Sequence, residues 1–96
     1  MNKKAILMNE NDSVAIALCD LNKNDTISII YKNKTFTELS AFENIEIYHK
    51  IAVKPIKKGD IIYKYGEVIG AATAPIEVGE HVHIHNIESV VVGNED

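Results

Sequence analysis

A repeated arrangement of proline and glycine constrains the fold of this chain more than any other feature. Residues 52–62 and residues 72–82 share the pattern Ala-x-x-Pro-Ile-x-x-Gly-(Asp/Glu)-x-(Ile/Val). Proline fixes φ and ends the preceding strand, whereas glycine supplies a left-handed turn residue just before the next strand. A weaker copy covers residues 20–27, with Asn24 in the place of glycine. Because so few copies cannot form a solenoid, the pattern predicts a compact domain of short strands and tight turns.

The aliphatic side chains also favour strands. Ile and Val together number 23, against four Leu. Branching at Cβ restricts rotamers in a helix and suits the pleated surface of a sheet. We therefore predict a mainly β fold with a hairpin turn at residues 32–34 and a frayed tail at residues 93–96. The predicted strands cover residues 3–8, 26–31, 35–39, 47–53, 61–64, 67–70, 81–85 and 87–92.

One segment departs from this pattern because its apolar residues recur at the spacing of a helix. These residues are Val14, Ala15, Ala17, Leu18 and Leu21. Asp12 or Ser13 precedes them, in the place where an N-cap side chain stands. We therefore predict one short helix over residues 13–21.

Length and charge exclude several classes of function. The 96 residues predict a single domain, and the net charge of −4 argues against a nucleic-acid partner. All ten basic residues are Lys, so the chain has no guanidinium group for bidentate capture of a carboxylate. The apolar runs are far shorter than the roughly 20 residues of a membrane span, and the N-terminus lacks the apolar core of a signal peptide. We therefore expect a cytoplasmic protein that does not bind membranes, and the single Cys19 excludes an internal disulfide.

Three of the four histidines alternate along one predicted strand. In an extended chain His81, His83 and His85 share one face, while Val82 and Ile84 point toward the core. Neighbouring imidazoles then start about 7 Å apart and can share a metal ion, whereas the outer two start roughly 13 Å apart. The spacing thus allows one adjacent pair of ligands and leaves the third histidine for proton transfer or substrate contact. The alternative is a polar strand face whose ring nitrogens are bonded to neighbours.

Two other groups are weaker candidates. Tyr63, Tyr65 and Glu67 share a face if the strand continues through Gly66, and a Tyr–Glu pair could serve acid–base chemistry. A turn packed by aromatic side chains is the alternative there. For His49, spacing alone favours a structural role.

Several strings, taken in order, resemble one known family. They are His49-Lys50-Ile51-Ala52, Lys64-Tyr65-Gly66-Glu67-x-Ile69-Gly70 and Gly79-Glu80-His81-Val82-His83-x-His85-Asn86. Together they resemble the SAF-type domain that forms the small subunit or N-terminal domain of altronate and galactarate dehydratases. The same domain resembles the small subunit of sulfolactate sulfo-lyase. The chain departs from the family pattern at Tyr48, where a glycine usually precedes the His-Lys pair, and at Asn24.

The resemblance implies a β-clip fold and lyase chemistry on a small hydroxy acid, with a divalent metal, iron or manganese, as the cofactor, held by this chain or mainly by a partner subunit. The leading hypothesis is a small subunit whose site is completed by a larger catalytic subunit. On this hypothesis His83, His85 and Tyr65 are catalytic. The metal ligands are His81 and His83, and the substrate-binding residues are Asn86, Lys50 and His49.

Other functions remain open at this point. The substrate is a sugar acid of the altronate or galactarate type, or alternatively sulfolactate. The β-clip fold also occurs in non-catalytic proteins, so a binding or assembly module is a second hypothesis. A stand-alone metal chaperone or sensor is a third. An exposed edge strand also allows a homo-oligomer.

Overall fold

Two antiparallel or mixed sheets account for the strands of the computed structural model, which describes residues 2–90. The larger sheet has the order β4-β3-β1-β2-β5-β8. Its strands are β1 (Lys3–Ile6), β2 (Val14–Ala17), β3 (Thr26–Tyr31), β4 (Lys34–Ser40), β5 (Lys50–Ala52) and β8 (His81–Val82). The smaller sheet has the order β6-β7-β9, formed by β6 (Ile61–Lys64), β7 (Glu67–Ala72) and β9 (Ile87–Glu88). The predicted mainly β fold is confirmed.

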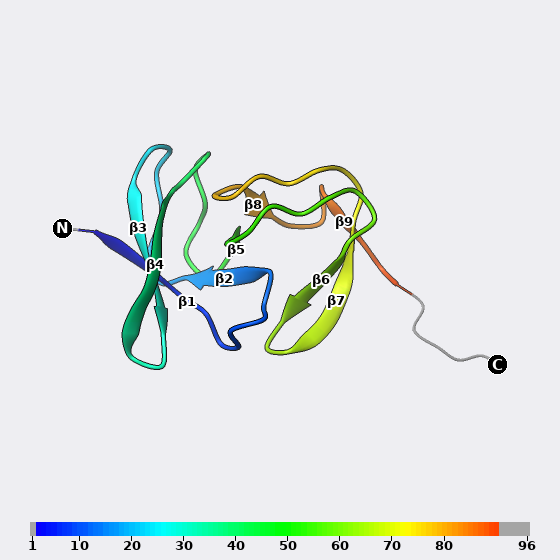
Figure 1. The fold of residues 1–96 in the computed structure, drawn as a ribbon. Coiled ribbons are helices and arrows are strands. Elements are labelled where there is room, and N and C mark those ends of the chain that lie inside the picture. Colours follow the sequence, from blue (N-terminus) through cyan, green and yellow to red (C-terminus); the bar gives the residue numbers. More distant parts are fainter. Residues whose placement is uncertain (1, 91–96) are drawn as a thin grey trace.

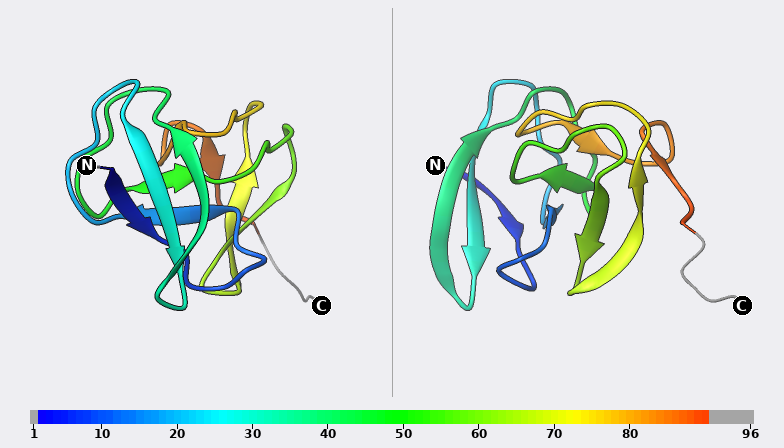
Figure 2. Two further views of the ribbon diagram at one scale, coloured as in Figure 1. Left: turned by 60° about the vertical axis from the view of Figure 1, so that its left-hand side comes forward. Right: turned by 45° about the vertical axis from the view of Figure 1, so that its right-hand side comes forward.

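Two hairpins stand at opposite ends of the molecule, with the short strands of the larger sheet between them (Figures 1 and 2). The first hairpin joins β3 to β4 through Lys32 and Asn33, which have φ angles of 51° and 66°. Positive φ at both central residues is typical of the type I′ turn, whose twist matches that of the strands. The predicted hairpin turn at residues 32–34 therefore lies where the sequence placed it. The second hairpin joins β6 to β7.

The predicted helix over residues 13–21 is wrong, because Val14–Ala17 form β2 and no helix occurs among residues 2–90. β2 lies between β1 and β5, so both of its edges are paired, and its two faces are covered by different apolar clusters. Ala15 faces one apolar cluster and Val14 faces the other. Burial on both faces removes the alternation of apolar and polar residues that marks a half-exposed strand. Accordingly, no helix in this part of the chain offers a long apolar membrane span.

The pattern seen twice in the sequence occurs four times in the structure. We name these segments repeat 1 (residues 17–27), repeat 2 (41–51), repeat 3 (52–62) and repeat 4 (72–82). The residue at the glycine position of each repeat has a positive φ, at 75°, 71°, 89° and 92° in turn. These residues are Asn24, Tyr48, Gly59 and Gly79.

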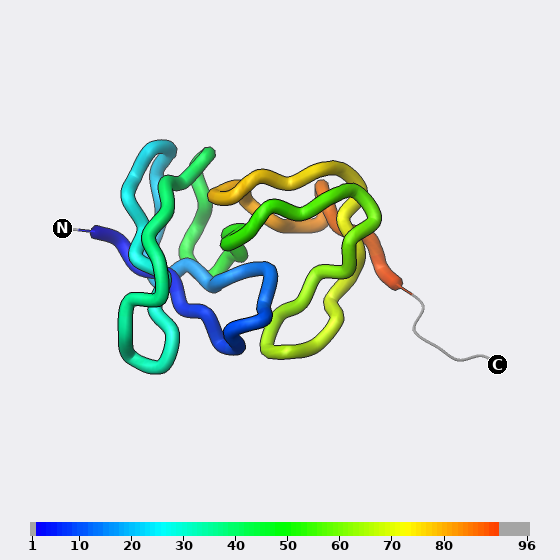
Figure 3. Tube along the Cα trace, in the orientation of Figure 1, coloured from blue at the N-terminus to red at the C-terminus, as the bar shows by residue number. Residues whose placement is uncertain are grey.

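Repeats 3 and 4 run side by side and bond to each other reciprocally (Figure 3). The amide of Ile56 donates to the carbonyl of Ile76 at 2.9 Å, and the amide of Ile76 donates back at 2.8 Å. Gly59 donates in the same way to Ala72, and Gly79 to Ala52. The pairing gives the turns backbone partners although few of their residues lie in strands.

Repeats 1 and 2 form the same reciprocal pair. Leu21 and Ile45 exchange backbone hydrogen bonds of 2.8 and 2.9 Å, as Ile56 and Ile76 do. Asn24 donates to the carbonyl of Ala41, and Tyr48 donates to that of Ala17. The backbone scaffold is therefore built twice. The sequence analysis found repeats 3 and 4 and part of repeat 1, and it missed repeat 2 because Tyr48 and His49 replace glycine and the acid.

Most predicted strands occur with different limits. Residues 26–31 and 61–64 match their strands, whereas the predictions for residues 3–8 and 47–53 are too long. The strand predicted at residues 81–85 ends at Val82. The strand predicted at residues 87–92 covers β9 in its described part. Residues 91 and 92 and the tail predicted at residues 93–96 lie outside the described residues.

Candidate histidine site

The chain turns sharply after β8, and this turn carries two of the histidines. The amide of Asn86 donates to the carbonyl of His83 at 3.0 Å. The side chain of Asn86 is buried in the same turn: its Oδ1 accepts from the amide of His83 at 2.9 Å, and its Nδ2 donates to the carbonyl of His81 at 2.8 Å. Asn86 thus fixes the backbone that presents the imidazoles.

The predicted alternation along an extended strand is therefore wrong beyond Val82. Ile84, expected in the core, has 81% of its surface exposed, while Val82 is buried as predicted. The turn folds the side chains toward one another. The ring centroid of His81 lies 5.3 Å from that of His83 and 5.4 Å from that of His85. The wide separation predicted for the outer two histidines does not occur.

The fourth histidine joins this group from a distant part of the sequence. His49 directly precedes β5, which pairs with β8 in a register that places Ile51 opposite His81. The Nδ1 atom of His49 lies 2.9 Å from the Nε2 atom of His81. Its ring centroid is 4.9 Å from that of His83. Sequence spacing could not show this contact, because it depends on the pairing of β5 with β8.

A carboxylate orients the His49 ring. Oε1 of Glu46 lies 3.5 Å from the Nε2 atom of His49. A carboxylate favours a proton on the facing nitrogen, so the other nitrogen of a neutral ring is an acceptor. In that tautomer Nδ1 of His49 accepts a hydrogen bond from Nε2–H of His81. The Nδ1 atom of His81 then carries a lone pair.

The surroundings keep two of the imidazoles neutral. Burial lowers the pKa of His81 below its usual value, and the neighbouring His49, His83 and His85 lower it further. Burial is also the first cause of the lowered pKa of His83, followed by His49 and Lys50. Neutral rings can accept a proton or bind a metal ion near neutral pH.

Three of the imidazoles are close enough to hold one metal ion. Each of His49, His81 and His83 offers a ring nitrogen, and these nitrogens all lie within 4.8 Å of one another. A metal ion bound by Nδ1 of His49 and Nε2 of His81 would take the place of the proton in their 2.9 Å hydrogen bond. Imidazole is a suitable ligand for iron, and the open coordination positions would remain for substrate or for another chain. The donor set therefore fits a divalent transition metal.

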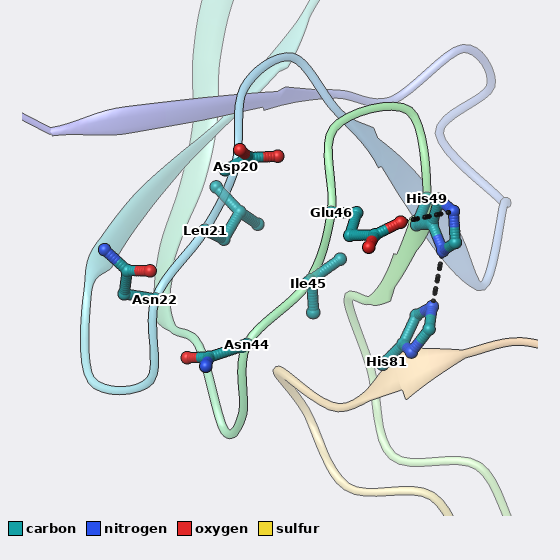
Figure 4. Close-up of a pocket in the computed structure, with 8 residues that line it drawn as sticks. All are labelled: Asp20, Leu21, Asn22, Asn44, Ile45, Glu46, His49 and His81. Carbon is teal, nitrogen blue, oxygen red and sulfur yellow. Dashed lines mark hydrogen bonds and ion pairs between the residues drawn. The ribbon is translucent and has the colours of Figure 1, made fainter.

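An open cavity of about 460 Å³ adjoins this histidine group (Figure 4). Leu21 and Ile45, the paired residues of repeats 1 and 2, contribute its apolar part. The polar side chains of its lining come from both repeats and from β8. They are Asp20, Asn22, Asn44, Glu46, His49 and His81.

Comparison of the four repeats shows why His49 is free to contact other rings. In repeat 1 the carboxylate of Asp25 accepts a hydrogen bond from the amide three residues earlier, at 2.7 Å. Asp60 and Glu80 do the same in repeats 3 and 4, at 2.9 and 3.0 Å. His49 occupies this position in repeat 2, and its ring turns toward His81 instead. The turn of repeat 2 therefore forms without a carboxylate at this position, and the His49 ring joins the histidine group instead.

Two further residues that the sequence singled out lie apart from the cavity lining. Lys50, in β5, has its pKa lowered by burial and by Lys64, and its charge is near enough to His83 to lower the pKa of that ring. Tyr65 lies in the β6–β7 turn with φ of 57°, and the ammonium of Lys64 is 4.9 Å from its ring centroid. Tyr65 has no described contact with the histidines. Its backbone amide donates to Asp12 at 2.8 Å.

Comparison with known proteins identifies the family of the chain. Residues 3–90 match the family described as the altronate/galactarate dehydratase SAF domain. The chain is 34% identical over 87 residues to the altronate dehydratase of Bacillus subtilis (strain 168), which covers 91% of the chain but only 16% of that protein. It is 41% identical over 75 residues to the altronate dehydratase of Escherichia coli (strain K12), covering 78% of the chain and 14% of that enzyme.

A second group of relatives is much shorter. The (2R)-sulfolactate sulfo-lyase subunit alpha of Paracoccus pantotrophus is 38% identical over 63 residues, which are 66% of the chain and 94% of that subunit. The chain thus spans about one sixth of the dehydratases that it matches and nearly the whole of a sulfo-lyase subunit. The family match to residues 3–90 includes the histidine group. The chain therefore belongs to the family of SAF domains found in altronate and galactarate dehydratases.

Proposed function

We propose that the chain is the small subunit of a dehydratase-like carbon–oxygen lyase that acts on a sugar acid. In this proposal a separate larger subunit completes the site. The single observation that carries the proposal is the convergence of His49, His81 and His83 beside an open cavity. A group of neutral imidazoles suits acid–base and metal chemistry, but it lacks most of what a complete lyase site needs.

The reaction would remove water from a 2,3-dihydroxy acid and give a 2-keto-3-deoxy acid. A base takes the proton from the carbon beside the carboxylate, and an acid protonates the departing hydroxyl group. His83 suits the first task because its lowered pKa keeps it neutral. His85, at the edge of the group and 5.4 Å from the His81 ring, suits the second. Because the chain has no Arg, Lys50 is the proposed partner of the substrate carboxylate: its charge is near enough to His83 to lower the pKa of that ring.

We further propose that His49, His81 and His83 hold the divalent iron or manganese ion of this chemistry. When bound, such an ion stabilises the negative charge that develops on the substrate as the proton leaves. The chain's own contribution is the fixed spacing of the nitrogens, which the Asn86 amide and the β5–β8 pairing maintain. His83 can serve either as a ligand or as the base: a His83→Ala variant that loses bound metal would indicate a ligand, and one that keeps metal but loses turnover would indicate the base.

Asn86 and Tyr65 were also predicted to act at the site, and they lie in different surroundings. Asn86 already uses both ends of its amide on the backbone, so its proposed contribution is to position His81 and His83. Asn86 is also buried, so direct contact with substrate would require this turn to open. Tyr65 is held in a different turn, and a catalytic role for it would require the larger subunit to bring substrate there.

One observation favours a second candidate, the small subunit of a sulfolactate sulfo-lyase. The chain matches 94% of the length of such a subunit in Paracoccus pantotrophus, whereas its dehydratase relatives are much longer. Both candidates predict a larger partner. They differ in the group that leaves the substrate, hydroxide in one and sulfite in the other.

Reconstitution with the large subunit tests the proposal. The complex should dehydrate altronate or galactarate, and His83→Ala should lower kcat at least a hundredfold while the subunits still associate. His85→Ala should shift the pH dependence of kcat without loss of bound metal, whereas His49→Ala should lose metal. Glu77→Gln, in the turn of repeat 4 and outside the histidine group, is the control for a substitution that should change neither turnover nor bound metal. Unchanged turnover in the His83 variant, or assembly that fails while turnover per assembled complex persists, would instead indicate a non-catalytic module.

A further inference from the structure

The cavity beside the histidine group is lined by carboxylates and carboxamides as well as imidazoles. Its polar lining combines two carboxylates, two carboxamides and two imidazoles, and it contains no lysine. Such a surface repels an anion, since no cation within the lining offsets the carboxylates. It suits hydroxyl groups, because carboxylates accept their protons and carboxamides both donate and accept.

The second pair of repeats is an internal control for these side chains. Repeats 3 and 4 carry Pro55 and Pro75 where repeats 1 and 2 carry Asp20 and Asn44. The reciprocal backbone bonds between Leu21 and Ile45 have counterparts in that second pair, formed without any polar side chain at the proline positions. The polar groups of Asp20 and Asn44 are therefore not needed to build the paired turns.

Both side chains are nevertheless held in place. Oδ1 of Asp20 accepts from the amide of Ile47 at 2.9 Å, and Oδ1 of Asn44 accepts from the amide of Lys23 at 2.9 Å. Each bond crosses from one repeat to the other. It fixes one end of the side chain and leaves a second polar atom, an oxygen on Asp20 and an amino group on Asn44, for a ligand.

The charged groups in the cavity lining differ from those around it. The lining holds Asp20 and Glu46 with His49 and His81, whereas Lys50 lies outside it, close enough to His83 to lower the pKa of that ring. Lys3 also lies outside the lining, and its ammonium donates to the backbone carbonyl of Asp20 at 3.0 Å. Figure 4 shows Asp20 and Glu46 on different repeats, with the Glu46 carboxylate turned toward His49. A molecule with one anionic end and one neutral hydroxylated end matches this polarity, with its neutral end in the cavity.

We propose that the cavity lined by Asp20, Asn22, Asn44 and Glu46 is a subsite for the neutral, polyhydroxylated end of the substrate, and that it rejects a second anionic group. The inference rests on the proposed function, because it assumes that the histidine group is the reaction site. It adds a selection among the candidate substrates. Altronate carries a chain of hydroxyl groups away from its single carboxylate, whereas galactarate has a carboxylate at each end and sulfolactate is a short dianion, so the subsite selects altronate over the other two.

Nuclear magnetic resonance of the ¹⁵N-labelled 96-residue chain tests the subsite with two probes. Mannitol, a neutral hexitol, should shift the backbone amides of Asn22 and Glu46 and the side-chain amide of Asn44. Malonate, a small dianion, should leave these signals in place at the same concentration. The inference is overturned if mannitol leaves them unmoved, or if malonate shifts them as much as mannitol does.

Matched substitutions on the two repeat pairs sharpen this test. Glu46 and Glu77 occupy the same position in repeats 2 and 4, so Glu46→Gln and Glu77→Gln make the same change of charge on equivalent backbones. Removing one hydrogen-bond acceptor from the cavity should weaken mannitol binding about three- to tenfold in the first variant and leave it unchanged in the second. Glu46→Lys should also admit malonate, whereas Glu77→Lys should not. Equal effects at the two positions would overturn the subsite.

The outcome separates this inference from the proposed function. If the complex with the large subunit dehydrates altronate but mannitol does not bind in the cavity, the subsite is overturned and the lyase assignment stands. If mannitol binds as expected but the chain neither associates with a large subunit nor supports turnover, the lyase assignment fails. The cavity would then remain a binding site for polyhydroxylated molecules.

Discussion

Nδ1 of His49 and Nε2 of His81 lie 2.9 Å apart although 32 residues separate them in the sequence. The pairing of β5 with β8 brings them together, and no segment of the chain contains both in a recognisable motif. His49 takes the place of a turn-closing carboxylate, and His81 begins a strand of two residues. The candidate site is thus assembled where two repeats meet.

The first prediction concerns metal binding by the isolated chain. Addition of Mn²⁺ or Fe²⁺ under anaerobic conditions should raise the thermal unfolding temperature, because a ligand bound only to the folded state stabilises it. His49→Ala should abolish most of this increase, since it removes one of the three nitrogens that lie within 4.8 Å of one another. Differential scanning calorimetry is the measurement, and His85→Ala is the control. An equal loss of stabilisation in both variants would contradict the proposed ligand set.

The second prediction follows from the lowered pKa values of His81 and His83 in the metal-free chain. A histidine whose folded pKa lies below its unfolded value of about 6.5 binds fewer protons in the folded state. The free energy of unfolding should therefore be insensitive to these two groups above about pH 6.5 and should fall as the pH decreases below it. Urea denaturation between pH 8 and pH 5 measures the trend. Ring proton signals that titrate above pH 6.5 would refute it.

The third prediction concerns Tyr48, which has φ of 71° and an exposed side chain. A left-handed conformation costs a residue with a Cβ atom about 1–2 kcal/mol, whereas glycine loses about 0.5–1 kcal/mol through its greater freedom when unfolded. Tyr48→Gly should therefore raise the free energy of unfolding by about 0.5–1 kcal/mol. Tyr48→Ala keeps the strain and serves as the control for loss of the ring. If the alanine variant gains as much as the glycine variant, backbone strain is not the cause.

The fourth prediction concerns Asp12, a buried residue that the sequence suggested as a helix N-cap. Its two carboxylate oxygens accept from the amides of Tyr65 and Gly66, each at 2.8 Å, and so close the β6–β7 turn. Asp12→Ala should lower the free energy of unfolding by about 3 kcal/mol or more, because it leaves two amides without their charged acceptor. Asp12→Asn keeps one acceptor and should cost less. Equal costs in urea denaturation would show that the two amides find water instead.

The fifth prediction uses equivalent glycines of repeats 3 and 4. A Cβ atom on Gly79 would lie 2.1 Å from the carbonyl oxygen of Ser40, whereas one on Gly59 would meet nothing within 4 Å. Their φ angles are similar, at 92° and 89°. Gly59→Ala should cost only the left-handed strain, about 1–2 kcal/mol, and Gly79→Ala should cost several kcal/mol more or unfold the chain. Circular dichroism with urea denaturation compares them. Similar losses would show that the Ser40 segment moves aside easily.

The sequence predicted the fold class because proline, glycine and asparagine at the turns are a local signal of where strands end and begin. It predicted a helix at residues 13–21 because β2 is buried on both sides, and a strand of that kind has the same apolar density as a short helix. For the site, the three histidines of residues 81–85 were visible as a group, but their geometry was not. The turn at Asn86 decides how those rings meet, and the pairing of β5 with β8 brings in His49. The Asn86 turn is local, with hydrogen bonds over three and five residues, but the alternation of His81, His83 and His85 predicted an extended strand instead. The pairing of β5 with β8 is a long-range contact that no local pattern encodes.

The chain holds two copies of one backbone framework, and the two copies contribute different parts of the site. Repeats 1 and 2 supply His49 and the other polar side chains of the cavity, whereas repeat 4 supplies only His81. Pro55→Asp, Pro75→Asn and Glu80→His would place the polar groups of Asp20, Asn44 and His49 on the equivalent turns of repeats 3 and 4, whose backbone already has the same hydrogen bonds. The positions that build the paired turns differ from the positions that carry the polar groups of the site. Substitutions can therefore change the polar groups while the backbone of the turns stays the same.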